Sequence, residues 1–314
     1  MTIRRLRRAA VTVTPVHSQA APELPQIKVK RRLKLIAQSP VDEQLVSEVF
    51  KVVPRLRRRP RKDGYTHVSD LIGKNKCVRK IALSDKFGTP IRPTRLSLFD
   101  RIVYAVGDTI HDVMKLVATE GAPHRVWGKW KCKCGHLFHD DPCLQSEIDP
   151  EDICPLCNTA CTYYQEASVF NEEYNIVGNP DLLFWIEEVA AFHVIELKSI
   201  AEAQFKELAR PLPEHVLQVV FYWWLMMESG RKVTDRVSIV YITKGYQFKG
   251  DPHKEFMIDP QAELYRLEPY LEDAMRLKLS RTQEVYPARK ACSGEYTTAA
   301  KKCEVCQHCF SLPG

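Results

Sequence analysis

The pattern of apolar and polar residues predicts helices in the first part of the chain and a helix–strand mixture later. Apolar residues recur at helical spacing from Leu96 to Glu120, and a shorter helix is expected over Ser69–Leu83, capped by Ser69 or Asp70. Beyond residue 165 apolar residues alternate or run together over short stretches, which is typical of strands. The expected strands cover 168–176, 181–186, 191–200 and 236–243, and further helices cover 203–210, 213–229 and 259–279.

This order of elements predicts an α/β fold with a mixed sheet. A Val-Gly-Asn-Pro turn is expected over 177–180, between the first two strands. Residues 128–165 interrupt the pattern with Cys, Asp, Pro and Gly, and are expected to form an insertion. Residues 1–63 show little periodicity apart from a short helix expected over 42–52. They are interpreted as a basic arm that precedes a catalytic domain over 64–314.

Charge is distributed unevenly along the 314 residues, which carry a formal net charge of +7. Residues 1–62 hold sixteen Lys or Arg against four acids, a balance of +12, so the remainder is near −5. A basic segment of this kind favours contact with nucleic acid, because phosphate binding releases counterions. A solvated tail without a partner and an organelle transit peptide are the alternatives; the first 22 residues hold four Arg and no acid.

Eleven cysteines are clustered: Cys77 alone, six from Cys132 to Cys161, and four from Cys292 to Cys309. Close spacing without a secretory signal favours thiolate–metal sites in a reducing compartment over disulfides, and hence a cytoplasmic protein. The longest apolar run, 216–227, is shorter than the ~18 residues of a membrane span, so we expect a buried helix and no membrane association.

Asp181, Glu196 and Lys198 form the most informative polar constellation. Asp181 follows a Gly-Asn-Pro turn and opens an apolar run, and Glu196 and Lys198 alternate with core residues on the expected strand 191–200. Alternate residues of a strand share a face, so the carboxylate and the amine project together. If the two strands pair, Asp181 and Glu196 can share a divalent cation such as Mg²⁺, and Lys198 can polarise water and offset transition-state charge.

Three helical residues extend this constellation. Gln218 and Tyr222 are four residues apart and share a helix face, from which they could hold phosphates or position the lysine. His111, on the earlier helix, could supply a further metal ligand. Each feature alone has a structural interpretation: a turn aspartate, a solvated strand edge, a surface histidine or a core tyrosine.

The ordered set resembles the PD-(D/E)XK nuclease superfamily, specifically the RecB-like exonuclease branch that includes CRISPR-associated RecB-like nucleases. The resemblance extends from about Thr66 to Phe310 and implies a restriction-endonuclease-like α/β/α core. It implies that Asp181 and Glu196 bind Mg²⁺ or Mn²⁺ and that Lys198 assists the attacking water. It further implies that His111 completes the metal shell, and that Gln218 and Tyr222 support the site.

A branch of this family carries a [4Fe-4S] cluster held by one cysteine before the core and three after it. The resemblance implies Cys77, Cys292, Cys303 and Cys309 as ligands, with 286–314 forming a clasp; Cys303 and Cys309 match the C-x5-C spacing of the family. Cys306 is an additional cysteine that could replace Cys292. The alternative is a terminal zinc site made of Cys292, Cys303, Cys306 and Cys309, without Cys77.

The cysteines of the insertion predict a structural zinc ribbon. Cys132 and Cys134 face Cys154 and Cys157 across nineteen residues, and four thiolates satisfy tetrahedral zinc. The first pair is one residue short of the usual C-x2-C, which leaves His136, Cys143 and Cys161 as alternative ligands.

These features together predict a metal-dependent deoxyribonuclease of DNA processing, recombination or repair, most simply an exonuclease of bacterial or phage origin. Single-stranded DNA or duplex ends are the expected substrates, and recombination or replication proteins the expected partners. The alternatives are a catalytically inactive nuclease fold and a zinc-ribbon DNA-binding accessory protein.

Overall fold

The computed structural model describes residues 64–73, 76–89, 97–139, 141–148, 153–159, 163–245 and 247–313. All of these residues belong to one compact unit, Val53–Gly314. The predicted basic arm, 1–63, and its short helix lie outside the described residues. None of the helices in the described ranges combines the length and hydropathy that a membrane crossing requires.

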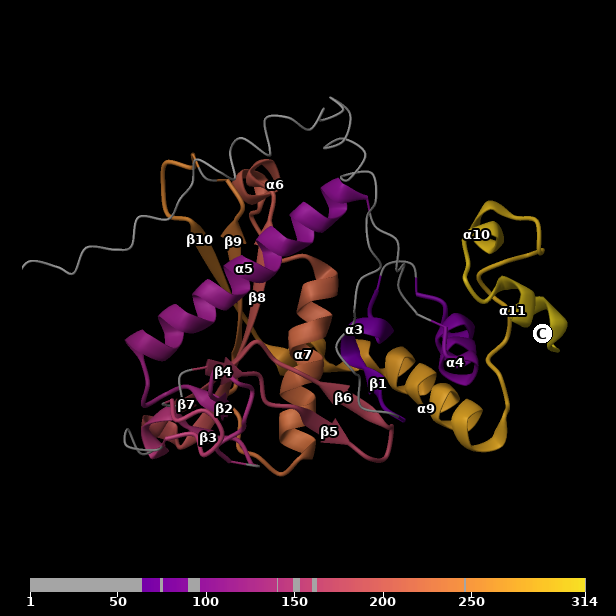
Figure 1. Cartoon of the computed structure of the whole chain (residues 1–314). Helices are drawn as coiled ribbons and strands as arrows, with labels where there is room; N and C mark the ends of the chain where they lie inside the picture. The colour runs from indigo at the N-terminus through magenta and orange to yellow at the C-terminus, as the bar shows by residue number, and fades with distance from the viewer. Residues whose placement is uncertain are drawn as a thin grey trace, which may run out of the picture. The chain divides into compact units, whose positions relative to one another are not determined.

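A four-stranded mixed sheet forms the centre of this unit, in the order β10-β9-β8-β7 (Figure 1). The central strands β8 and β9 are parallel, and the outer pairs are antiparallel. The strands are β7 (Leu182–Ile186), β8 (Ala191–Ile200), β9 (Val237–Thr243) and β10 (His253–Ile258). The predicted α/β class with a mixed sheet is therefore confirmed.

Two long helices contact the central strands. Helix α7 (Pro213–Glu228) begins with a proline at its first turn, and ten of its sixteen residues are buried in the larger apolar core, together with Val194 of β8. Helix α5 (Leu98–Gly121) begins at a capping box formed by Ser97 and Asp100. Its inner residues pack in a second apolar cluster with Ile195 and Leu197. Successive residues of β8 thus point to different cores, as strand geometry requires.

A second sheet, in the order β1-β6-β5, lies next to α7. One predicted strand differs from the strands that this sheet contains. The expected strand 168–176 is divided into β5 (Val169–Asn171) and β6 (Ile176–Gly178), which pair as a hairpin; β6 also pairs with β1 (Thr66–His67). The hairpin turn lies over 172–175, where Asn175 has a φ of 51°. Val177 and Gly178, predicted to be in a turn, are therefore strand residues.

The insertion forms a third, small sheet in the order β3-β2-β4, from β2 (Trp127–Lys131), β3 (Cys143–Leu144) and β4 (Tyr163–Gln165). The short 3-10 helix η1 (Gln145–Glu147) follows β3. The insertion is joined to the central sheet by backbone contacts at its start: Val126 bridges Phe184, and the amide of Trp185 donates to the carbonyl of Arg125.

The remaining helices complete the described chain. The predicted helix 69–83 is divided into α3 (Val68–Leu71) and α4 (Val78–Phe87); the thiol of Cys77, rather than Ser69 or Asp70, accepts an amide at the start of α4. The predicted helix 259–279 is also divided, by the 3-10 turn η3. The turn η2 (Glu187–Val189) precedes β8. The helical elements that follow β8, besides α7, are α6 (Glu202–Glu207), α8 (Pro260–Glu263), η3 (Leu264–Leu267), α9 (Glu268–Gln283), α10 (Thr298–Lys301) and α11 (Cys306–Ser311). Helix α4 contacts both α9 and α11.

Candidate functional site

Strand pairing brings Asp181 and Glu196 together. Asp181 immediately precedes β7, and the first residue of β7, Leu182, lies opposite Ile195 of β8. Continuing this antiparallel register places Asp181 beside Glu196. Both residues are buried: Asp181 is 8% exposed and Glu196 is 2% exposed.

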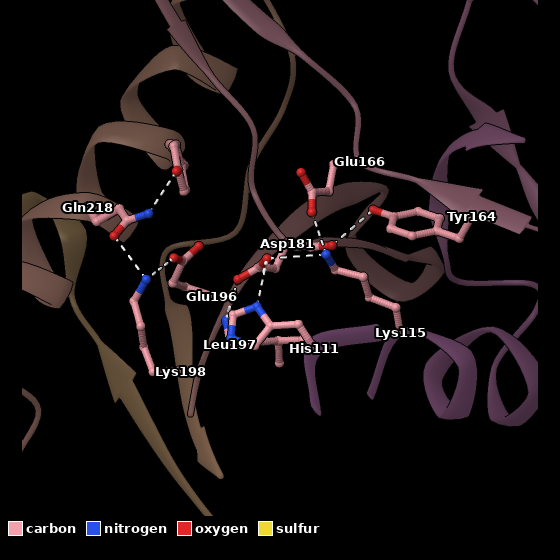
Figure 2. Close-up of polar contacts among 10 residues, drawn as sticks. His111, Lys115, Tyr164, Glu166, Asp181, Glu196, Leu197, Lys198 and Gln218 are labelled. Atoms are coloured by element: carbon pink, nitrogen blue, oxygen red, sulfur yellow. Dashed lines mark hydrogen bonds and ion pairs between the residues drawn. The ribbon is translucent and has the colours of Figure 1, made fainter. Parts of the chain in front are cut away.

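The two carboxylate oxygens of Asp181 have different partners (Figure 2). Oδ2 accepts a hydrogen bond of 2.9 Å from the backbone amide of Leu197, which fixes the side chain against β8. Oδ1 lies 3.4 Å from Nδ1 of His111 and 3.4 Å from Nζ of Lys115. Burial alone would raise the pKa of Asp181, but His111 and the charges of two lysines lower that pKa to about 2. Asp181 is therefore ionised near neutrality.

Glu196 is held differently. Its Oε1 accepts from the ammonium group of Lys198, while its buried Oε2 has no hydrogen-bond partner among the described residues. Burial raises the pKa of Glu196 to about 8; Lys198 lowers that pKa, and the charge of Asp181 raises it. An unpaired buried carboxylate oxygen costs free energy until a proton or a cation satisfies it.

Lys198 is positioned by two residues of α7. Its Nζ donates to Oε1 of Gln218 at 3.0 Å, and Nε2 of Gln218 donates to the hydroxyl of Tyr222 at 2.8 Å. A Cβ added to Gly178 would lie 2.7 Å from the Tyr222 ring, so only glycine permits this approach of β6 to α7. Burial raises the pKa of Tyr222 well above its usual range, so Tyr222 keeps its proton.

The structure thus brings all six predicted residues of this constellation into one network, with His111 coming from α5. It also adds three residues that the sequence reasoning missed. Lys115 contacts both Asp181 and Glu166, and the hydroxyl of Tyr164 donates to the backbone carbonyl of Asp181 at 3.2 Å. The spacing of His111 and Lys115, four residues apart on one helix, could have indicated the lysine. No comparable signal marks Glu166 or Tyr164.

Asp181, Glu196 and His111 supply hard oxygen donors and an imidazole, a donor set that suits Mg²⁺ or Mn²⁺. The unpaired Oε2 of Glu196 fits the same role. In the described part of the chain, however, the ligand atoms of these three residues do not all lie within 4.8 Å of one another. Lys115 and Lys198 instead contact the two carboxylates.

A separate group of four cysteines can hold a metal ion. The sulfur atoms of Cys132, Cys134, Cys154 and Cys157 all lie within 4.8 Å of one another. The turns that carry them have the expected chemistry: Gly135 and Asn158 have positive φ, and the amide of Leu156 donates to the sulfur of Cys154 at 3.4 Å. This arrangement is compatible with the predicted zinc ribbon. Neither His136 nor Cys143 joins this group, and Cys161 lies outside the described residues.

The remaining five cysteines line one small cavity of about 20 Å³ between α4 and the C-terminal segment; they are Cys77, Cys292, Cys303, Cys306 and Cys309. Burial raises the pKa of the Cys77 thiol, and the neighbouring thiols of Cys292, Cys303 and Cys309 raise it further. Burial and the neighbouring thiols of Cys303, Cys309 and Cys292 also raise the pKa of Cys306, whose sulfur lies 3.9 Å from the carbonyl oxygen of Glu295.

Arg79 also connects α4 to the C-terminal segment. This arginine is 1% exposed, and its guanidinium donates to the sulfur of Cys309 at 3.3 Å. It further donates to backbone carbonyls of Pro287, Cys309, Leu312 and Pro313. The structure therefore places Cys77 with the C-terminal cysteines, although 214 residues separate it from Cys292.

No protein-family model matches the chain, and no curated protein matches its sequence. Among solved structures, the fold is similar to the protein SSO0001, with 16% identity, 82% of this chain and 90% of that chain covered, and a TM-score of 0.36. It is also similar to an alkaline exonuclease from Laribacter hongkongensis, with 12% identity, coverage of 71% and 91%, and a TM-score of 0.39. Both TM-scores lie below 0.5, so neither likeness supports a function for this chain.

Proposed function

We propose that this chain is a divalent-metal-dependent nuclease that hydrolyses phosphodiester bonds in DNA. The observation that carries the proposal is the carboxyl group of Glu196, which is buried beside Asp181 and Lys198 with one oxygen unpaired. A carboxylate in this state is suited to accept a cation. The ordered Asp, Glu-x-Lys and Gln-x-x-x-Tyr motif supports a restriction-endonuclease-like core of the RecB-like branch.

Asp181, Glu196 and His111 would hold the cation, which when bound supplies Lewis-acid polarisation of the scissile phosphate. Lys198 would orient the attacking water and offset the negative charge that develops on the phosphate. Gln218 supports this role because its amide holds the ammonium group of Lys198, and Tyr222 in turn holds the amide. The ammonium group of Lys198 is therefore already oriented before the substrate binds.

The wider assignments follow from charge and cysteine chemistry. The basic residues of 1–62 favour DNA as the polyanion, with single strands or duplex ends as substrate and an exonuclease as the form of the activity. Zn²⁺ is proposed for the group of Cys132, Cys134, Cys154 and Cys157. A [4Fe-4S] cluster is proposed for Cys77, Cys292, Cys303 and Cys309, the four that the family resemblance implies; their thiols line one cavity, together with that of Cys306.

The test is cleavage of end-labelled DNA in Mn²⁺ or Mg²⁺, with EDTA as the metal-free control. We expect Glu196→Ala and Lys198→Ala each to lose about 10³-fold or more in rate, since both side chains act in the transition state. Glu187→Ala and Lys232→Ala are matched controls on exposed residues and should cleave normally.

DNA affinity of the inactive variants, measured in Ca²⁺, should stay close to that of the wild type. Wild-type cleavage by Glu196→Ala would refute the assigned site. A wild-type protein that binds DNA but cleaves it in neither metal would identify a nuclease-fold binding protein instead.

A further inference from the structure

Lys115 lies between two carboxylates, and none of the proposed catalytic roles explains this position. Its ammonium group pairs with Oε1 of Glu166 and also lies 3.4 Å from Oδ1 of Asp181 (Figure 2). Its side chain is only 13% exposed, so the charge is poorly screened by solvent. A cation bound by Oδ1 of Asp181 must therefore either displace this ammonium group or coexist with it.

Glu166 owes its position to the insertion. It directly follows β4, which pairs with β2 in the register Lys129–Gln165, Trp130–Tyr164 and Lys131–Tyr163. Gly128 of β2 allows close packing here, because a Cβ at this position would lie 2.3 Å from the Tyr164 ring. The end of β4 thus lies beside α5, and the carboxylate of Glu166 contacts the same ammonium group of Lys115 as Asp181 does (Figure 2).

We propose that Lys115 and Glu166 together set the affinity of the Asp181 site for a divalent cation. Lys115 is the competitor of the cation, and Glu166 restrains Lys115. Lys115 competes with the cation for Oδ1 of Asp181. Glu166 holds the lysine partly away from that oxygen, so that the competition is incomplete. The proposal rests on the proposed function only in taking Asp181 as a cation ligand. Lys115 and Glu166 are both positioning residues, because neither is required to touch substrate.

The signs of the two substitutions differ. Glu166→Gln leaves Asp181 as the main anionic partner of Lys115, so the ammonium group pairs more closely with Oδ1 and cation binding weakens. Lys115→Met removes the competitor, so cation binding strengthens. The two effects are not independent: once the lysine is gone, Glu166 acts only through its own charge, which is the weakest of the charges that act on Glu196, so its substitution should matter little. A simple loss of local structure would weaken binding in every variant.

Direct Mn²⁺ binding, followed by the electron paramagnetic resonance signal of free Mn²⁺, measures this without any cleavage assay. Asp181→Asn identifies the part of the binding that belongs to this site. We expect Glu166→Gln to raise the dissociation constant about tenfold and Lys115→Met to lower it about tenfold, as is typical for charges in contact. In the Lys115→Met background, adding Glu166→Gln should change the constant by less than about twofold.

The ion pair of Lys86 and Glu284 provides the matched control, because it joins α4 to the end of α9 and contacts none of these residues. Lys86→Met and Glu284→Gln should leave Mn²⁺ binding unchanged. If Lys115→Met does not fold by circular dichroism, Lys115→Gln removes the same charge with a polar side chain.

Equal effects of Glu166→Gln in both backgrounds would overturn the proposal, as would weaker binding in Lys115→Met or the absence of Asp181-dependent binding. Normal Mn²⁺ results in a protein that cleaves no DNA would instead refute the proposed nuclease function and leave this inference standing.

Discussion

Asp181 and Glu196 are neighbours, but their pKa values are shifted in opposite directions. Hydrogen bonding and lysine charges lower the pKa of Asp181 to about 2, whereas burial raises the pKa of Glu196 to about 8. For Asp181 the folded pKa is below the unfolded value, so its contribution to stability is present near neutrality and is lost only as pH falls towards 2. For Glu196 the folded pKa is above the unfolded value, so its contribution is complete below about 4.5 and is lost as pH rises through 8.

The residue-scale prediction is therefore that metal-free wild type loses stability between pH 5 and 8.5 through ionisation of Glu196. Glu196→Gln cannot ionise and should lack this component, so the difference in Tm between the two proteins should shift by about 3 °C or more over this range. Differential scanning calorimetry with EDTA measures it.

Divalent metal provides the internal control for this pH dependence. Mn²⁺ added at pH 8 should restore Tm in the wild type and have little effect on Glu196→Gln, since the ionised carboxylate is the expected ligand. A pH-independent Tm difference between the two proteins would contradict the assignment of the raised pKa to Glu196.

At the scale of elements, the sequence was informative where periodicity was strong and local. The apolar run of β7, the alternation in β8 and the long apolar helix α7 were predicted almost to their ends. The hairpin of β5 and β6 was mistaken for one strand, because its turn depends on Asn175 adopting a positive φ. The sequence analysis does not predict β10, because its inward face alternates Lys254 with Phe256 and Ile258, while the exposed Met257 weakens the apolar–polar contrast.

The candidate site shows the same division. Asp181, Glu196 and Lys198 follow one another along a predicted hairpin, so their proximity could be inferred from strand geometry. Glu166 and Lys115 come from separate elements, and the contact of β4 with α5 brings them together. Contacts of this kind depend on tertiary packing, which a periodic pattern does not record.

The element-scale prediction concerns β4. Cys154→Ser should remove the metal of the cysteine group, about one zinc per chain by metal analysis. Because β4 carries Glu166, the same substitution should weaken Mn²⁺ binding at the Asp181 site in the direction of Glu166→Gln. Cys143→Ser is the matched control: Cys143 packs at the second apolar cluster and is not part of the sulfur group. Unchanged Mn²⁺ affinity after zinc loss would show that β4 keeps its position without the metal.

At the scale of the described unit, the prediction concerns the cysteines that gather around α4. Anaerobically purified wild type should be brown, with broad visible absorbance from an iron–sulfur cluster. Cys77→Ser should lose the colour and lower Tm by about 5 °C or more, because it releases a link between segments that are distant in sequence.

Cys306→Ser is the matched control for the clasp and should keep the colour, because the proposed ligand set is complete with Cys292 as the fourth ligand; loss of colour would indicate that Cys306 takes the place of Cys292. Colourless protein with a second zinc, and a Cys77→Ser variant of normal stability, would favour the terminal zinc site over the cluster.

The guanidinium of Arg79 has a consequence for the order in which the chain can fold during synthesis. Its backbone partners all lie between Pro287 and Pro313, so none of them has been translated when α4 leaves the ribosome. Helix α4 must therefore remain open or solvated for most of translation, since a buried, unpaired guanidinium would be costly. The guanidinium of Arg79 can therefore be fully paired only after residues 287–313 have been synthesised and have reached α4.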